Sequence, residues 1–290
     1  MAQHQVLGAR LYYESLGSGP PLLMIPGGNG TAHIFGPIAK LLAERFTVIT
    51  YDRRGFARSQ LDGPQDYGRR LETDADDALK LIEEVAGAPA TVFGPSSGAI
   101  VALQAVTQGR GLIDKVVAFE PPAMKQLAAG ERMLGFLDEV YDLYKKSGIP
   151  PAFGRFNEKL FPPETIEHFA RLRDTNLPEV RAAVEYWFEH ELRQYCGADL
   201  DIEALKANAR RIAVGRGQNS RGYPLHELAA NLANRLGSPP IELPGAHTGY
   251  ATRAAAFAPA LLDLFATIDA DRDGGSSAAV TEPTRHVVRG

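Results

Sequence analysis

Short apolar runs alternate with amphipathic stretches through the first 122 residues of the chain. The runs at 22–25, 46–51, 91–93 and 113–119 are rich in β-branched and aromatic side chains, which is typical of buried strands. The stretches between them carry apolar residues at helical spacing, as in 72–85. Strands that alternate with helices in this way predict an α/β protein with a doubly wound, mostly parallel sheet.

The pattern changes between residues 123 and 205, where amphipathic stretches follow one another without a strand-like run. One of them, 179–195, is expected to form a single long helix whose aromatic face includes Trp187. Strand-like runs return at 211–214 and 240–243, with helical stretches after each of them. The helical segment is therefore expected to be inserted between strands of the sheet.

These changes divide the chain into three parts. We expect residues 1–122 and 206–270 to form the core and residues 123–205 to form a helical cap over it. Residues 271–290 contain few apolar side chains and no periodicity, which predicts a disordered tail.

The composition excludes several classes of function. A formal net charge of −4 and a hydrophobic content of 44% are ordinary for a soluble globular protein and give no support to binding of nucleic acid or of an anionic membrane. No stretch approaches the roughly 18 apolar residues of a membrane span. The first residues show no basic region followed by an apolar one, so we expect no secretory signal. The single cysteine, Cys196, excludes an intramolecular disulfide and a cysteine-based metal site. We therefore expect a cytoplasmic protein.

The sequence Gly94-Pro-Ser96-Ser97-Gly98 carries the clearest chemical signal. It joins a strand-like run to an apolar stretch with helical spacing, the context in which Gly-x-Ser-x-Gly presents a nucleophilic serine. Small residues at 94 and 98 allow a tight turn that lifts the Ser96 hydroxyl at the carboxyl end of the strand. The Ser97 amide would then face a developing negative charge from a helix N-terminus. A glycine-rich turn with an idle serine is the alternative.

Other candidate residues follow strands of the same predicted sheet. Serine needs a base to remove its proton, and of the seven histidines His247 follows a late strand on a glycine-containing loop. Gly28, in the glycine-rich loop 26–31, would supply a second amide for an oxyanion, although this loop could also be a plain flexible turn. Asp52 is expected to tie down its own turn with neighbouring arginines. Carboxyl ends of parallel strands share one edge of the sheet, which brings these residues near each other.

Together these motifs resemble the α/β-hydrolase family over nearly all of residues 8–267. The resemblance rests on the sequences at 26–28, 52–59, 94–98 and 244–247. It implies Ser96 as nucleophile, His247 as base, and the amides of Gly28 and Ser97 as donors to an oxyanion.

The resemblance leaves the acid of the triad in an uncommon place. In the usual family pattern the acid follows the strand after the cap, but the loop 215–222 contains no carboxylate. Glu120 ends the strand after the nucleophile unit, where a minority of family members place the acid. Its spacing of 24 residues from Ser96 and the Phe-Glu-Pro-Pro context resemble the zearalenone-lactonase-like branch, whose acid is a glutamate at this place. Asp199 and Asp201 are the reserve candidates. Pairing of Glu120 with an arginine of the cap is the alternative to a catalytic role.

The resemblance implies acyl transfer on an ester or lactone of an apolar small molecule, with no metal and no organic cofactor. A serine at position 96 argues against haloalkane dehalogenase and epoxide hydrolase chemistry, which uses an aspartate there. A carbon–carbon bond hydrolase, a cofactor-free perhydrolase and a ligand-binding protein with little turnover remain alternatives. Trp187 is a candidate substrate-binding residue that would roof an apolar pocket.

Overall fold

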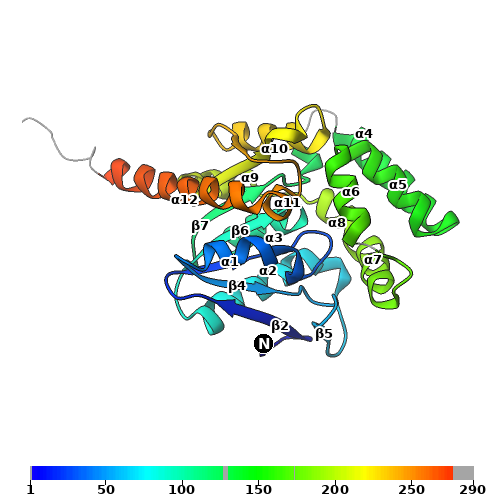
Figure 1. The fold of residues 1–290 in the computed structure, drawn as a ribbon, viewed down its shortest axis with the longest axis horizontal. Coiled ribbons are helices and arrows are strands. Elements are labelled where there is room, and N and C mark those ends of the chain that lie inside the picture. Colours follow the sequence, from blue (N-terminus) through cyan, green and yellow to red (C-terminus); the bar gives the residue numbers. More distant parts are fainter. Residues whose placement is uncertain (1, 127–129, 173, 277–290) are drawn as a thin grey trace, which may run out of the picture.

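The structure is a computed structural model that describes residues 2–126, 130–172 and 174–276. A nine-stranded sheet forms the centre of these described residues (Figure 1). The strands are β1 (Ala2–Val6), β2 (Ala9–Leu16), β3 (Pro21–Met24), β4 (Thr47–Tyr51), β5 (Gln60–Leu61), β6 (Ala90–Pro95), β7 (Ile113–Phe119), β8 (Ile212–Gly217) and β9 (Ile241–Leu243).

Most of the sheet is parallel, as predicted. The strand order is β1-β2-β4-β3-β6-β7-β8-β9, with β5 paired to β2. All pairs from β4 to β9 in this order are parallel, whereas β1, β2 and β5 pair in the antiparallel sense. The apolar pattern does not reveal β1 and β5, because both are short edge strands with mostly exposed or half-buried polar residues.

Helices bury both faces of the sheet, which explains the continuous apolar runs of its central strands. In β6, Val92 belongs to the apolar core on one face and Phe93 to the core on the other. In β7, Val116 and Val117 divide in the same way. The first core is shared with α2 (Arg70–Lys80), α3 (Ser97–Thr107) and α10 (Pro224–Arg235), and the second with α1 (Gly36–Leu42), α11 (Gly249–Thr252) and α12 (Ala254–Ser276).

Residues between β7 and β8 form helices in the part of the chain that the structure describes. We call residues 124–207 the helical insertion; its α-helices are α4 (Gly130–Ser147), α5 (Ile149–Leu160), α6 (Pro163–Leu172), α7 (Pro178–His190), α8 (Leu192–Cys196) and α9 (Ile202–Ala207). Helices α4 to α8 gather on one side of the sheet, at the right of Figure 1. A third apolar core, which includes Phe156, Trp187 and Phe188, holds them together.

Two expectations about helices need correction. The single helix expected over 179–195 is interrupted at Glu191, whose backbone (φ −129°, ψ −48°) separates α7 from α8. Its carboxylate turns into the protein and binds Arg53. Residues 271–276, expected to be disordered, continue α12, and the remaining tail residues 277–290 lie outside the described residues.

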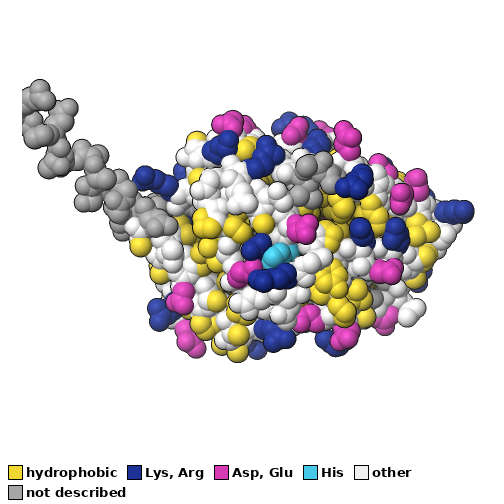
Figure 2. Space-filling view, turned by 90° about the horizontal axis from the view of Figure 1, so that it is seen from above, with side chains coloured by type: hydrophobic (Ala, Val, Ile, Leu, Met, Phe, Trp, Pro, Cys, Tyr) yellow, Lys and Arg dark blue, Asp and Glu magenta, His cyan; other side chains and the backbone are white. Residues whose placement is uncertain are grey.

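Charges of both signs are mixed on the face of the molecule that Figure 2 shows, in keeping with the net charge of −4. Among the described residues, no helix combines the length and the apolar character needed to cross a bilayer.

Candidate active site

Ser96 occupies a strained turn between β6 and α3. Its backbone adopts φ 55° and ψ −128°, a conformation that residues other than glycine rarely adopt. A Cβ added at Gly94 would lie 2.3 Å from the Gly98 carbonyl oxygen, and one added at Gly98 would lie 2.1 Å from the carbonyl oxygen of Ile25. Only glycine therefore fits at both flanking positions, and the turn holds Ser96 at the carboxyl end of β6.

Glu120 lies directly behind His247. The carboxylate of Glu120 is fully buried, and its Oε2 lies 2.7 Å from Nδ1 of His247. Its Oε1 accepts a hydrogen bond of 2.8 Å from the Gly217 amide. The Glu120 backbone is left-handed (φ 46°) while its amide donates to the Gly215 carbonyl in β8. Two neighbours on β8 thus fix a strained residue whose second carboxylate oxygen faces the histidine.

The reserve acids lie elsewhere. The side chain of Asp199 is 86% exposed, with Lys125 3.7 Å away. Asp201 accepts a hydrogen bond of 2.9 Å from the Ala204 amide and caps the N-terminus of α9. The structure therefore brings Glu120, and not these two aspartates, to the predicted base.

Asp52 has the structural role expected for it. Its buried carboxylate accepts hydrogen bonds from the Ala32 amide (2.8 Å) and from Arg58 Nε (2.7 Å). The adjacent Arg53 and Arg54 bind other carboxylates. The expected interaction of Asp52 with an arginine of its own turn is confirmed, and the arginine is Arg58.

The two predicted oxyanion donors have free amides. Among the described residues, the amides of Gly28 and Ser97 donate to no acceptor, whereas the nearby Gly30 amide donates to the Gly27 carbonyl (2.9 Å). Gly28 and Ser97 both line the cavity that Ser96 lines. Their amides are therefore available to an oxygen atom placed beside the Ser96 hydroxyl.

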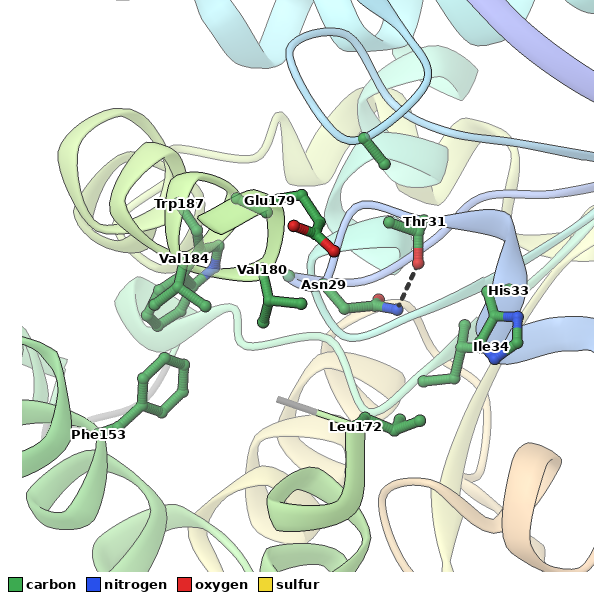
Figure 3. A pocket seen from close by; sticks show the side chains of 13 residues that line it. Asn29, Thr31, His33, Ile34, Phe153, Leu172, Glu179, Val180, Val184 and Trp187 are labelled. Atoms are coloured by element: carbon green, nitrogen blue, oxygen red, sulfur yellow. Dashed lines mark hydrogen bonds between the residues drawn. The ribbon is translucent and has the colours of Figure 1, made fainter. Parts of the chain in front are cut away.

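Two adjoining cavities lie between the sheet and the helical insertion. The inner cavity, about 40 Å³, is lined by Ser96, His247 and a mostly apolar wall that includes Phe161. The Phe161 ring also packs on the His247 ring, with 4.7 Å between centroids. The outer cavity, about 220 Å³, is shown in Figure 3; Val180 and Val184 of α7 contribute to its apolar lining. The residues common to both cavities are Gly28, Asn29, Ile34 and Trp187.

Trp187 stands at the junction of the two cavities. Its side chain is 6% exposed and stacks on Phe153 with 5.5 Å between ring centroids. A Cβ added at Gly28 would lie 2.6 Å from the indole Nε1, so the indole lies directly against the glycine-rich loop. Within the described residues, Nε1 has no hydrogen-bond partner. A buried donor without a partner is costly and is available to a bound ligand.

Cys196 also lines the inner cavity. Burial, with a smaller contribution from Glu191, raises the pKa of its thiol far above the usual value. The thiol therefore stays protonated at neutral pH, which makes it a poor nucleophile. Among the residues described, no group of three or more His, Cys, Asp and Glu side chains could hold a metal ion.

Two carboxylates that the sequence did not indicate join the helical insertion to the loops of the site. Glu164 of α6 accepts a hydrogen bond of 2.9 Å from the Ala246 amide, next to His247. Glu191 binds Arg53 at 2.8 Å. Neither contact has a local sequence signal, because each joins segments far apart in the chain.

Comparisons with known proteins agree with this architecture. The model of the "Alpha/beta hydrolase family" matches residues 22–261. The uncharacterized hydrolase YraK of Bacillus subtilis (strain 168) is 34% identical over 266 residues, which cover 90% of this chain and 94% of that protein. The enol-lactonase from Burkholderia xenovorans LB400 has a TM-score of 0.66 at 18% identity, covering 92% of this chain and 100% of that chain. A thermophilic esterase from Thermogutta terrifontis has a TM-score of 0.72 at 16% identity, with coverages of 92% and 99%.

The chain belongs to the α/β-hydrolase family, and it is a hydrolase of the kind that acts on small molecules. The two solved structures are too distant in sequence to support more than the fold. The reaction and the substrate class therefore have to be argued from the site itself.

Proposed function

We propose that this protein is a serine hydrolase that cleaves an ester or lactone of an uncharged, largely apolar small molecule through an acyl-enzyme on Ser96. One observation carries the proposal: the buried Glu120 carboxylate lies 2.7 Å from His247 Nδ1, and His247 shares a cavity with a serine on a strained turn. This arrangement matches the roles of acid, base and nucleophile in a catalytic triad.

In the proposed mechanism, the Ser96 hydroxyl attacks the carbonyl carbon while His247 Nε2 removes its proton. The amides of Gly28 and Ser97 donate to the oxygen that becomes negative in the tetrahedral intermediate. Glu120 accepts from Nδ1–H and stabilises the imidazolium. The imidazolium then protonates the departing alkoxide, and His247 next activates the water that releases the acid and restores Ser96.

The cavities support a substrate of moderate size with an apolar body. About 40 Å³ beside Ser96 leaves room for only a few non-hydrogen atoms around the reacting carbonyl. We propose that the rest of the substrate occupies the outer cavity of about 220 Å³, under a cap formed by the helical insertion. Trp187 would contact the substrate where the cavities meet, through its ring and its unpaired N–H. Glu179, exposed at the rim, disfavours substrates with a carboxylate at that end.

The test combines active-site labelling with a substrate panel. We expect a fluorophosphonate to label Ser96, and aryl esters and medium-sized lactones to be hydrolysed. Ser96→Ala should lower kcat by about 10⁴-fold or more. Ser147→Ala is the control, because Ser147 is exposed at the end of α4 and lines neither cavity; its kcat should stay within about threefold of the wild-type value.

Several results would contradict the proposal. Labelling at another residue, or a Ser96→Ala variant that keeps more than about a tenth of the activity, would remove Ser96 as nucleophile. Turnover of β-diketones or of hydrogen peroxide, without ester hydrolysis, would instead indicate a carbon–carbon bond hydrolase or a perhydrolase. Tight ligand binding without turnover of any compound would indicate a binding protein.

A further inference from the structure

We infer that Arg53 is a positioning residue that holds the Gly27–Gly28 peptide so that the Gly28 amide faces the substrate oxyanion. The inference rests on the proposed function, because it assigns a role to a residue outside the triad in the same reaction. Glu191 of the helical insertion binds the same guanidinium, so the position of the insertion also affects the oxyanion site.

Arg53 donates two hydrogen bonds to the glycine-rich loop, which a third bond within the loop supports. Its Nη2 donates to the Gly27 carbonyl oxygen at 2.8 Å, and its own amide donates to the Gly30 carbonyl at 2.8 Å. The Gly30 amide closes the loop by donating to the same Gly27 carbonyl at 2.9 Å. The Gly27 carbonyl therefore accepts two hydrogen bonds, one of them from a charged group.

These contacts determine where the Gly28 amide points. A trans peptide is planar, so the Gly27 carbonyl and the Gly28 N–H point in opposite directions from the same unit. Fixing the carbonyl oxygen on Arg53 therefore fixes the N–H on the other side, and Gly28 lines the inner cavity. Hydrogen bonds to the carbonyl also polarise the peptide, which strengthens its N–H as a donor.

Gly27 and Gly28 have no side chains that could hold this orientation. A Cβ at Gly27 would lie 3.1 Å from the Ser96 Cβ, and a Cβ at Gly28 would lie 2.6 Å from Trp187 Nε1. The loop thus lies between the nucleophile and the helical insertion, with a tight fit at Gly27 and no room for a side chain at Gly28 unless Trp187 moves. Glycine leaves the peptide free to rotate unless neighbours restrain it, and Arg53 restrains it together with the Gly30 amide.

Arg53 is itself firmly held. Its guanidinium is fully buried, with Nη1 2.8 Å from Asp74 of α2 and Nη2 2.8 Å from Glu191. Burial alone would lower the pKa of Arg53, but the Glu191 and Asp74 carboxylates hold it above the usual value. A charged group in such surroundings has little freedom to move. The orientation of the Gly28 amide therefore depends on α2 and on the helical insertion together.

The next residue in the chain supplies a matched control. Arg54 is also buried and binds Asp77 through two hydrogen bonds of 2.6 and 2.7 Å. Its other partners are Gln65 and the Leu7 carbonyl, far in sequence from the glycine-rich loop. Arg54→Lys therefore disturbs a comparable buried ion pair without removing a contact to Gly27.

The experiment compares Arg53→Lys and Arg54→Lys in the full-length protein. Besides kcat and KM for an aryl ester, it measures inhibition by an alkyl trifluoromethyl ketone, whose adduct with Ser96 carries an oxyanion, and by the methyl ketone of the same alkyl chain. Loss of an oxyanion donor typically lowers kcat by about 10²–10³-fold, so a misdirected donor should cost about 10–100-fold. For Arg53→Lys we expect kcat and the affinity for the trifluoromethyl ketone to fall by the same factor, about 10–100-fold. KM and the affinity for the methyl ketone should stay within about threefold of the wild-type values. Arg54→Lys should leave all four quantities within about threefold.

If Arg53→Lys does not fold, Glu191→Gln tests the role of Arg53 instead. Glutamine keeps an acceptor for Arg53 without the charge, and we expect the same pattern with losses of about 3–10-fold. Unchanged trifluoromethyl ketone affinity in whichever of these variants folds, or an equal loss in Arg54→Lys, overturns the role of Arg53. A wild-type protein that neither binds the trifluoromethyl ketone nor reacts with a fluorophosphonate at Ser96 would instead overturn the proposed function, and the inference with it.

Discussion

Replacing Glu120 with glutamine tests the least common feature of the proposed triad. Glu120 Oε1 accepts from the Gly217 amide at 2.8 Å, and glutamine can keep that bond only by using its carbonyl oxygen. Its NH₂ group then faces His247 Nδ1, which lies 2.7 Å from the second carboxylate oxygen of Glu120. The imidazole must accept at Nδ1 and carry its hydrogen on Nε2, where it cannot take the proton from Ser96.

The expected loss follows from this change of tautomer. In a serine protease triad, the equivalent loss of the orienting carboxylate lowers kcat by about 10⁴-fold. We expect kcat to fall by about 10³–10⁴-fold here, or about 4–5.5 kcal/mol at 1.36 kcal/mol per tenfold. KM should stay within about threefold, because Glu120 is buried behind the histidine and lines neither cavity. Both hydrogen bonds persist, so the free energy of unfolding should change by only about 1 kcal/mol.

The assay measures kcat and KM with an aryl ester and the unfolding free energy in urea, for Glu120→Gln beside Asp201→Asn. Asparagine caps a helix about as well as aspartate, so the control should match the wild type. A Glu120→Gln variant that keeps more than about a tenth of kcat, or an Asp201→Asn variant that loses as much, would contradict the assignment of Glu120 as the acid.

Three further predictions concern the Ser96 turn, the buried charge of Asp74, and Trp187 of the helical insertion. Gly98→Ala places a Cβ 2.1 Å from a backbone oxygen and should lower the free energy of unfolding in urea by at least about 2 kcal/mol. The control Gly135→Ala in α4 meets open space and should raise that free energy by about 0.5–1 kcal/mol. Equal effects of the two variants would contradict the turn geometry. Burial favours the neutral form of Asp74, but two arginines hold the pKa of this carboxyl below its usual value, so its stabilising charge is present above about pH 4 and is lost at lower pH. Asp74→Asn should therefore cost about 3–5 kcal/mol at pH 7, and the difference from wild type should shrink below pH 4; a difference independent of pH would be the contrary result. Trp187→Phe keeps an aromatic ring but removes the N–H, and should lower kcat/KM for esters by about 3–10-fold; an unchanged value would assign Trp187 to packing alone.

Much of the fold could be predicted because its signals are local. The central strands are buried on both faces, so Val92 and Phe93 are both apolar and the run is visible in the sequence. The edge strand β1 has no such run, because only Val6 among its residues is buried. The break between α7 and α8 was missed since Glu191 leaves the helix to bind an arginine 138 residues away.

The candidate site, too, could be predicted only where its sequence signals are local. Ser96 and Glu120 directly follow strands, and His247 lies on the loop after the last strand. These residues could be predicted from the sequence because parallel strands present their carboxyl ends at one edge. The role inferred for Arg53 could not be nominated, because a sequence pattern carries no information on which carbonyl a long side chain will reach.

The central claim is that Ser96 carries the acyl group of the substrate during turnover. The direct measurement is mass spectrometry of protein quenched within milliseconds to seconds after mixing with excess aryl ester. We expect a transient mass increase of one acyl group, mapped to the peptide that contains Ser96, and no such increase in Ser96→Ala. Hydrolysis without acylation of Ser96, or acylation that persists in Ser96→Ala while turnover continues, would contradict it.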